Sequence, residues 1–325
     1  MKVLQVDTFS AWNAQANCMG LYNAYARVGN VMQFDYRWFA KRYNAKRMNN
    51  LLIQRAKSWH PDIIHFDKCE TVAGETVREI RRALPDAFLY HLYGDLRPGV
   101  QKYVKAIGPH VDMTLLYYDD DIMFRHHLDA GCRDVRMWFN GTDPSIFYPR
   151  KVKKECDVVF FGNENKAASS NTSGRRDCLR AIADANFTVR IYGKGWQQLA
   201  THGNITVHKF VDMDDFAIAC SKSRISLAWN DNHVRLYTSW RRLLNSMACG
   251  TMVLTRWFPG IATVFNKGEH LAWFGDIGNC VDMVGAYLGR LNDTREEIAR
   301  KGMEEVRERH TWDHRVAQIL EWSSK

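Results

Sequence analysis

Short apolar runs alternate with segments of helical periodicity along the first half of this 325-residue chain. Residues 2–7 form a short run typical of a strand, whereas the apolar positions of residues 49–59 recur with the period of a helix. Such alternation favours an α/β fold with a doubly wound parallel sheet, because each helix connects one parallel strand to the next. The expected strands are 2–7, 31–36, 62–66, 87–92 and 113–117, and the expected helices are 20–28, 49–59, 74–83, 100–107 and 119–130.

Turn-forming residues at 140–149 (NGTDPSIFYP) interrupt this alternation and precede the charged stretch 150–155. The alternation then resumes, and the chain is long enough for two domains with separate cores. We therefore place a domain boundary near residue 148. In the second half the expected strands are 157–161, 187–192, 205–207 and 225–229, and the expected helices are 175–185 and 213–220.

The composition is that of a globular protein: hydrophobic residues make up 46% and no apolar run approaches the roughly 20 residues that span a bilayer. The apolar run at residues 1–6 is too short for the hydrophobic region of a signal peptide. The eight cysteines are scattered without a C-x-x-C pair for zinc or redox chemistry. These features predict a cytoplasmic protein. The net charge of +9 favours an anionic partner, although the same charge could serve solubility alone.

The stretch 237–276 predicts a helix, a short strand, a turn, a second short helix and another strand. Hydroxyl residues at 237–239 precede an amphipathic run that ends near Met247, so a helix N-terminus follows a polar loop. The N–H groups and positive dipole end of such a terminus favour a diphosphate. Arg235 and Arg241 flank it and could donate to phosphate oxygens.

Several motifs of the second half, taken in order, resemble one enzyme family. They are SWRRLLNSMACGTMVLT at 239–255, VFNKGEH at 264–270, VVFFGN at 158–163, IYGKGW at 191–196, SRISLAWN at 223–230 and HTWDHR at 310–315. Together they resemble the spore-maturation (CgeB-like) glycosyltransferases, relatives of the family 4 group of GT-B enzymes. The turn segment 140–149 is similar to the interdomain signature of family 4.

The resemblance implies a GT-B enzyme with two Rossmann-like domains that face each other across a cleft. Residues 1–148 would bind the acceptor, residues 149–310 the nucleotide sugar, and residues 311–325 would form a helix that returns to the first domain. The implied activity is transfer of a sugar from a nucleoside diphosphate sugar, most simply a UDP-sugar, to an acceptor hydroxyl. The sugar, the stereochemical outcome and the oligomeric state stay open.

Two glycine loops follow expected strands, at Gly162-Asn163 and at Gly193-Lys194, where an α/β sheet binds ligands. Arg175 or Arg176 could add a second cation beside Lys194. By resemblance, residues 207–211 hold the nucleotide base through main-chain groups. The residues predicted to bind the donor are Gly162, Asn163, Arg175, Gly193, Lys194, His208, Phe210, Arg235, Thr238, Ser239, Arg241 and Asn245.

Two positions depart from the family pattern. Asn245 stands where relatives carry a glutamate that accepts ribose hydroxyls, and Tyr237 stands where an acid is expected eight residues earlier. An amide oxygen still accepts a hydrogen bond, but without the charge-assisted strength of a carboxylate. A nucleic-acid-binding protein with a decayed transferase site therefore stays open as an alternative.

Asp95, in the loop after an expected central strand, is our candidate for the catalytic base, because many GT-B enzymes present an aspartate or histidine there. The alternative is an Asx-turn residue beside glycine and proline, and His91 and Asp67 are reserve candidates. No metal or other cofactor is expected. Residues 119–121 immediately precede a helix, where aspartates cap it and complement its dipole, and arginine, lysine and main-chain N–H groups would neutralise the diphosphate.

The acceptor is indicated by residues 36–57, which contain seven Lys or Arg and no acid, interleaved with aromatics. Cations neutralise phosphates and aromatics stack on bases, although the same residues could form a solvated surface over a core. DNA is therefore the preferred acceptor, through a 5-hydroxymethylcytosine or 5-hydroxymethyluracil (HMU) base flipped from its stack, as in phage enzymes that glycosylate such bases. A surface glycan or a protein is the alternative acceptor. The predicted acceptor-binding residues are Trp12, Asn13, Arg37, Lys41, Arg42, Lys46 and Arg47.

Overall fold

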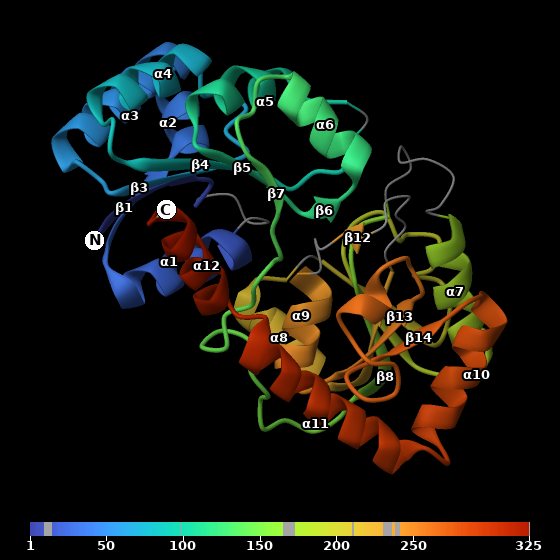
Figure 1. Cartoon of the computed structure of the whole chain (residues 1–325). Helices are drawn as coiled ribbons and strands as arrows, with labels where there is room; N and C mark the ends of the chain where they lie inside the picture. The colour runs from blue at the N-terminus through green and yellow to red at the C-terminus, as the bar shows by residue number, and fades with distance from the viewer. Residues whose placement is uncertain are drawn as a thin grey trace. The chain divides into compact units, whose positions relative to one another are not determined.

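The computed structural model describes residues 1–9, 15–97, 99–164, 173–209, 211–229, 236–237 and 241–324. The chain forms two compact units (Figure 1). The first comprises Met1–Gly141, Val234–Ser239 and Trp312–Lys325, and the second comprises Thr142–His233 and Trp240–Thr311.

The first unit is built on a six-stranded parallel sheet of order β2-β1-β3-β4-β5-β7. Its strands are β1 (Lys2–Asp7), β2 (Asn30–Asp35), β3 (Ile63–Asp67), β4 (Phe88–Tyr93), β5 (Met113–Leu116) and β7 (Val135–Met137). The two-residue strands β6 (Tyr118–Asp119) and β12 (Leu236–Tyr237) form a separate antiparallel pair. This pair holds a short segment of the second half of the chain within the first unit.

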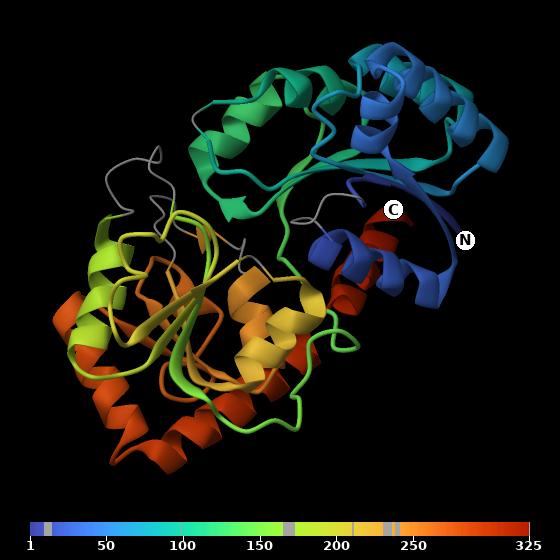
Figure 2. The ribbon, with the colours of Figure 1, turned by 180° about the vertical axis from the view of Figure 1, so that it is seen from behind.

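Helices cover both faces of the first sheet (Figures 1 and 2). Helices α1 (Gln15–Val28) and α12 (Trp312–Ser323) share one core with alternate residues of β1, β3 and β4, and Arg27 pairs with Asp313 at 2.7 Å. Helices α2 (Tyr36–Arg42), α3 (Ala45–Trp59) and α4 (Gly74–Ala83) pack on the opposite face. The remaining helices of this unit are α5 (Lys102–Ile107), the 3₁₀ turn η1 (Gly108–His110) and α6 (Asp121–Asp129).

The second unit has another six-stranded parallel sheet, of order β10-β9-β8-β11-β13-β14. Its strands are β8 (Cys156–Phe161), β9 (Val189–Tyr192), β10 (Ile205–His208), β11 (Ser223–Ala228), β13 (Met252–Arg256) and β14 (Ala272–Phe274). Its helices are α7 (Ser173–Asp184), α8 (Met213–Ser221), α9 (Arg241–Ala248), α10 (Ile277–Leu288) and α11 (Asn292–Arg309), with the 3₁₀ turn η2 (Ile261–Thr263). Helices α7 and α10 share one core with β8 and β11, whereas the side chains of Phe216 in α8 and Ser246 in α9 contact Phe161 and Ser226.

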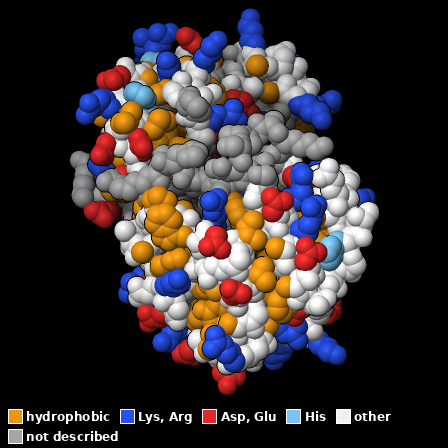
Figure 3. Space-filling model, turned by 90° about the vertical axis from the view of Figure 1, so that its right-hand side faces the viewer, with side chains coloured by type: hydrophobic (Ala, Val, Ile, Leu, Met, Phe, Trp, Pro, Cys, Tyr) orange, Lys and Arg blue, Asp and Glu red, His pale blue; other side chains and the backbone are white. Residues whose placement is uncertain are grey.

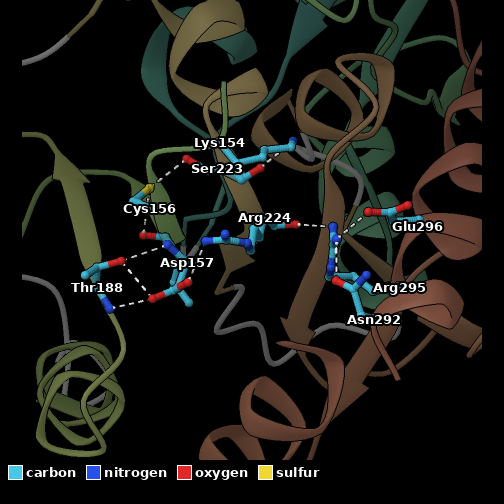
Figure 4. A network of polar contacts seen from close by, with 10 residues as sticks. Lys154, Cys156, Asp157, Thr188, Ser223, Arg224, Asn292, Arg295 and Glu296 are labelled. Atoms are coloured by element: carbon cyan, nitrogen blue, oxygen red, sulfur yellow. Dashed lines mark hydrogen bonds and ion pairs between the residues drawn. The ribbon is translucent and has the colours of Figure 1, made fainter. Parts of the chain in front are cut away.

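A polar network fastens the strand starts of the second sheet (Figure 4). The Asp157 carboxylate accepts from the backbone N–H of Thr188 at 2.9 Å and from Arg224 Nη1 at 2.9 Å. The Arg224 carbonyl in turn accepts from Arg295 Nη1 at 3.3 Å. Ion pairs and hydrogen bonds therefore close the amino ends of these strands, whereas glycine loops follow the carboxyl ends of β8 and β9.

The alternation of strands and helices expected from the sequence is confirmed, and several elements are corrected. The helix expected at 20–28 begins at Gln15, and β7 was not predicted. The helix expected at 49–59 begins at Ala45, because Asn44 caps it by accepting from Arg47 N at 2.8 Å. A separate helix, α2, precedes it, and its cap Asp35 accepts from Trp38 N at 2.9 Å. Tyr237 does not precede the donor-site helix as a cap, because it lies in β12 and the helix begins at Arg241.

Candidate functional site

The two predicted glycine loops lie directly against each other at the carboxyl ends of β8 and β9. Gly162 N donates to Tyr192 O at 2.9 Å, and Lys194 N donates to Asn163 Oδ1 at 2.8 Å. A side chain at Gly193 would overlap the Gly162 carbonyl, so the position requires glycine. The structure therefore brings Gly162, Asn163, Gly193 and Lys194 together, with Lys194 exposed.

Arg242 is the cation that lies over this junction. A Cβ atom at Gly162 would stand 2.7 Å from Arg242 Nη1, so the exposed guanidinium occupies the space that glycine leaves. The sequence favoured Arg241 instead. Arg241 precedes Arg242 as the first residue of α9 and stays a predicted ligand.

Arg176 has a structural partner. It forms an ion pair with Glu164, whose side chain is 4% exposed, and Glu164 N donates to Lys194 O at 2.8 Å. The pair braces the loop after β8 against α7. Arg175 is half-buried near the start of the same helix.

An aromatic ladder crosses the ends of three neighbouring strands. Phe161 stacks on Tyr192 at 5.3 Å between ring centroids, and Tyr192 stacks on His208 at 4.7 Å. Burial, and secondarily Arg190, lower the pKa of His208, which keeps the imidazole neutral near pH 7. A flat, uncharged surface thus lies at the predicted base-binding edge.

Asn245 is buried in α9, where its Oδ1 accepts from Thr142 Oγ1 at 2.7 Å. Its amide oxygen therefore holds the start of the second unit, and its role toward a ribose stays a prediction. Six of the predicted site residues lie outside the described residues: Phe210, Arg235, Thr238, Ser239, Trp12 and Asn13.

In the first unit, Asp95 follows β4 and forms a salt bridge with Lys68, whose Nζ lies 2.7 Å from Asp95 Oδ2. Arg97 Nε lies farther away, at 3.8 Å. The reserve candidate His91 is fully buried, and its Nε2 bonds the Lys68 carbonyl at 2.9 Å. Burial lowers the pKa of His91 to about 4, so a neutral, enclosed ring holds the turn from which Lys68 reaches Asp95.

The expectation that the acids at 119–121 serve a helix is confirmed for Asp120 and Asp121, whereas Asp119 lies in β6 and pairs with Leu236. Asp120 caps α6 by accepting from Met123 N at 2.9 Å, and Asp121 lies in the first turn. Among the residues that the structure describes, one group of acids and histidines has ligand atoms close enough for a metal ion: Asp7, His65 and Asp67. Sequence reading missed this group, although β1, β2 and β3 each end in aspartate.

The basic segment 36–57 divides into paired and exposed parts. Arg37 pairs with Glu70 at 2.6 Å and Lys57 pairs with Glu79 at 2.7 Å, so acids from α4 and the turn before it neutralise two of its cations. The aromatics divide as well: Tyr36 is buried, whereas Trp38 and Tyr43 are 47% and 42% exposed. The remaining predicted cations are all exposed: Lys41, Arg42, Lys46 and Arg47.

Two of these exposed cations occupy electrostatically unfavourable positions, whereas Lys41 and Arg42 lie in the last turn of α2, where cations complement the helix dipole. Lys46 and Arg47 lie at the amino end of α3, whose first turn holds no acid, and cations there oppose the helix dipole. Arg47 also lies over the Tyr43 ring, at 4.8 Å from its centroid. On the face of the molecule in Figure 3, by contrast, Lys and Arg are interspersed with Asp and Glu.

Known proteins resemble this architecture. A glycosyl transferase-like family model matches residues 175–321. The sucrose-phosphate synthase of Thermosynechococcus elongatus has a TM-score of 0.68 and 12% identity, with 99% of this chain and 98% of that one covered. Anabaena Alr3699/HepE, in complex with UDP and glucose, has a TM-score of 0.68 and 12% identity, with 99% of each chain covered. The fold is GT-B.

A third similar GT-B structure is an alpha-glucosyltransferase in complex with UDP and a 13-mer DNA containing an HMU base, with a TM-score of 0.69, 10% identity and full coverage of both chains. No curated protein matches the chain at a significant level. The matched family model is the broad glycosyl transferase-like one, so the closer resemblance to the CgeB-like group stays a prediction. In the described part of the chain, no helix combines the length and apolarity needed to cross a membrane.

Proposed function

We propose that this protein is a glycosyltransferase that takes a sugar from a UDP-sugar, bound by the second unit, and transfers it to an acceptor hydroxyl bound by the first. The carrying observation is the junction of Gly162 and Gly193 beneath Arg242. Glycine loops at the carboxyl ends of parallel strands, next to a guanidinium and a helix N-terminus, suit a diphosphate. The family match over residues 175–321 supports the same assignment.

The donor pocket that we propose uses this chain's own cations. Arg242 and Lys194 neutralise the diphosphate without a metal ion at that position, and the edge formed by Tyr192 and His208 faces the base. Two similar structures are described with UDP, which makes a uridine nucleotide the first donor to test. The same two cations stabilise the negative charge of the diphosphate as it leaves, when the acceptor hydroxyl attacks the sugar.

For the acceptor we propose a 5-hydroxymethylpyrimidine base in DNA. The amino end of α3 with Lys46 and Arg47, beside the exposed rings of Trp38 and Tyr43, offers charges for phosphates and surfaces for bases. The similar alpha-glucosyltransferase in complex with HMU-containing DNA supports this choice. A hydroxymethyl group supplies the hydroxyl that the transfer requires.

Asp95 is the proposed base that accepts the proton of that hydroxyl. Its salt bridge with Lys68 orients the carboxylate, and the buried His91 holds the Lys68 backbone. A cytoplasmic location is part of the proposal. The eight cysteines are buried thiols outside any disulfide, which suits a reducing compartment.

The test is transfer of label from radioactive UDP-sugars to three duplexes of one sequence that contain cytosine, 5-hydroxymethylcytosine or HMU. We expect label in a hydroxymethylated duplex and none in the cytosine duplex. Label in a glycan or protein fraction instead would move the acceptor to that class. If the purified chain neither binds nor hydrolyses any UDP-sugar, the transferase assignment is wrong and a decayed site that binds DNA becomes the better description.

A further inference from the structure

Three neighbouring parallel strands of the first sheet, β2, β1 and β3, each have an aspartate as their last residue. The register places Asp7 of β1 opposite Asp35 of β2, and Gln5 of β1 opposite His65 of β3. Asp7 lies two residues after Gln5 and Asp67 lies two residues after His65, so the two aspartates are opposite each other on adjacent strands. Residues two apart in a strand share a face, so Asp7, His65 and Asp67 face the same side of the sheet.

Ligand atoms of these three residues lie within 4.8 Å of one another. A divalent transition-metal ion sits about 2.0–2.2 Å from nitrogen and carboxylate ligands, so three ligands around one ion are roughly 3–4 Å apart. The observed spacing is close to that of ligands around one ion. Two adjacent strands hold the ligands, which gives the group a rigid frame.

His65 provides the independent observation. Its side chain is 0% exposed, yet neither ring nitrogen has a hydrogen-bond partner. A buried polar group without a partner costs about 1–3 kcal/mol and calls for an explanation. A metal ion bound to one of these nitrogens would supply the missing partner, and imidazole is a common metal ligand.

The Asp7 carboxylate is oriented as metal-ligating carboxylates are. Thr8 N donates to its Oδ1 at 2.6 Å and Gln5 Nε2 donates to its Oδ2 at 3.2 Å, while each oxygen keeps a further lone pair. The side chain is only 2% exposed. Two carboxyl groups in so enclosed a place repel each other, and a cation between them offsets that repulsion.

We propose that Asp7, His65 and Asp67 bind a divalent first-row transition-metal ion, with Mn²⁺ and Zn²⁺ as the ions that a mixed oxygen and nitrogen set suits. The site lies in the first unit, whereas the proposed diphosphate ligands lie in the second. The ion stabilises the turn after β3. That turn carries Lys68 and Cys69 at φ 61° and 58°, and Lys68 reaches Asp95.

The experiment uses the full chain, stripped with a chelator and titrated calorimetrically with MnCl₂ or ZnCl₂. We expect wild-type protein to bind one equivalent, and His65→Leu and Asp67→Asn each to weaken binding by roughly 100-fold or more, as expected for loss of a direct ligand. Asp35→Asn is the matched control. It removes one charge from the same strand edge, and asparagine still caps α2.

Thermal unfolding supplies a second readout. Metal should raise the melting temperature of wild-type protein but not of Asp7→Asn, whereas the metal-free Asp7→Asn variant should melt above metal-free wild type because the repulsion is gone. No heat and no melting shift with either ion would overturn the proposal. An equal loss of affinity in Asp35→Asn would overturn it as well, since that result indicates diffuse attraction by acids rather than coordination.

Discussion

Gly193 packs on the carbonyl group of Gly162 so closely that no side chain fits between them. The contact joins the loops after β8 and β9, and Trp196 Nε1 fastens it by donating to Gly162 O at 2.7 Å. The two loops therefore behave as one rigid surface.

Gly193→Ala should separate these loops. The added methyl group meets backbone rather than a flexible side chain, so we expect about 1–3 kcal/mol of destabilisation and a large loss of UDP affinity. Gly203→Ala is the control, because nothing lies within 4 Å of a Cβ at that position. Urea unfolding and calorimetric UDP binding measure the two effects, and equal behaviour of the two variants would contradict the expected packing.

Arg242→Ala should weaken UDP binding by roughly 10- to 100-fold, because a charged hydrogen bond contributes about 1.5–3 kcal/mol. Stability should hardly change, since the side chain is exposed. Arg180→Ala removes an exposed arginine from α7 and should leave the affinity as it was. A similar weakening in Arg180→Ala would mean that only the overall charge matters.

Asp95→Asn should lower kcat for transfer by about 10²- to 10⁴-fold, the range for loss of a general base. The dissociation constant for UDP should stay unchanged, because the proposed donor ligands lie in the second unit. Asp86→Asn, in the turn before β4, controls for an exposed aspartate. Full activity of Asp95→Asn in a labelled-sugar assay would assign the proton transfer to another group.

Lys46→Ala combined with Arg47→Ala should weaken DNA binding and reduce the slope of log K against log salt by about 2, roughly 0.9 for each phosphate that is no longer neutralised. Lys57→Ala, at the other end of α3, is the control because its cation is paired with Glu79. Fluorescence anisotropy at several salt concentrations gives both slopes. An unchanged slope in the double variant would place DNA binding elsewhere.

Stability should fall on acidification partly through His91. The unfolded chain protonates this histidine below about pH 6.5, whereas the folded chain does so only near its pKa of about 4. The unfolded state therefore binds more protons in that window, and the unfolding free energy decreases by up to about 2 kcal/mol between pH 7 and pH 5. His91→Asn should show a shallower decrease in urea titrations, and identical slopes would contradict the shift.

The composition of residues 36–57 predicted a basic surface but not which of its cations are paired with acids. Residues 36–57 contain no acid, but the fold places Glu70 beside Arg37 and Glu79 beside Lys57. Which cations stay exposed is decided by segments distant in sequence. The charge count predicted the character of this surface, and the fold determined which of its cations are paired with acids.

The order of strands and helices, and with it the parallel α/β architecture, follows from the sequence, because hydrophobic periodicity and turn residues are local properties. The glycine loops after β8 and β9 were predictable for the same reason. Tertiary structure alone decided that Arg242 lies over Gly162, and that Asp7, His65 and Asp67 meet. Those relationships depend on helix rotation and on strand register, which are set by long-range packing rather than by neighbouring residues.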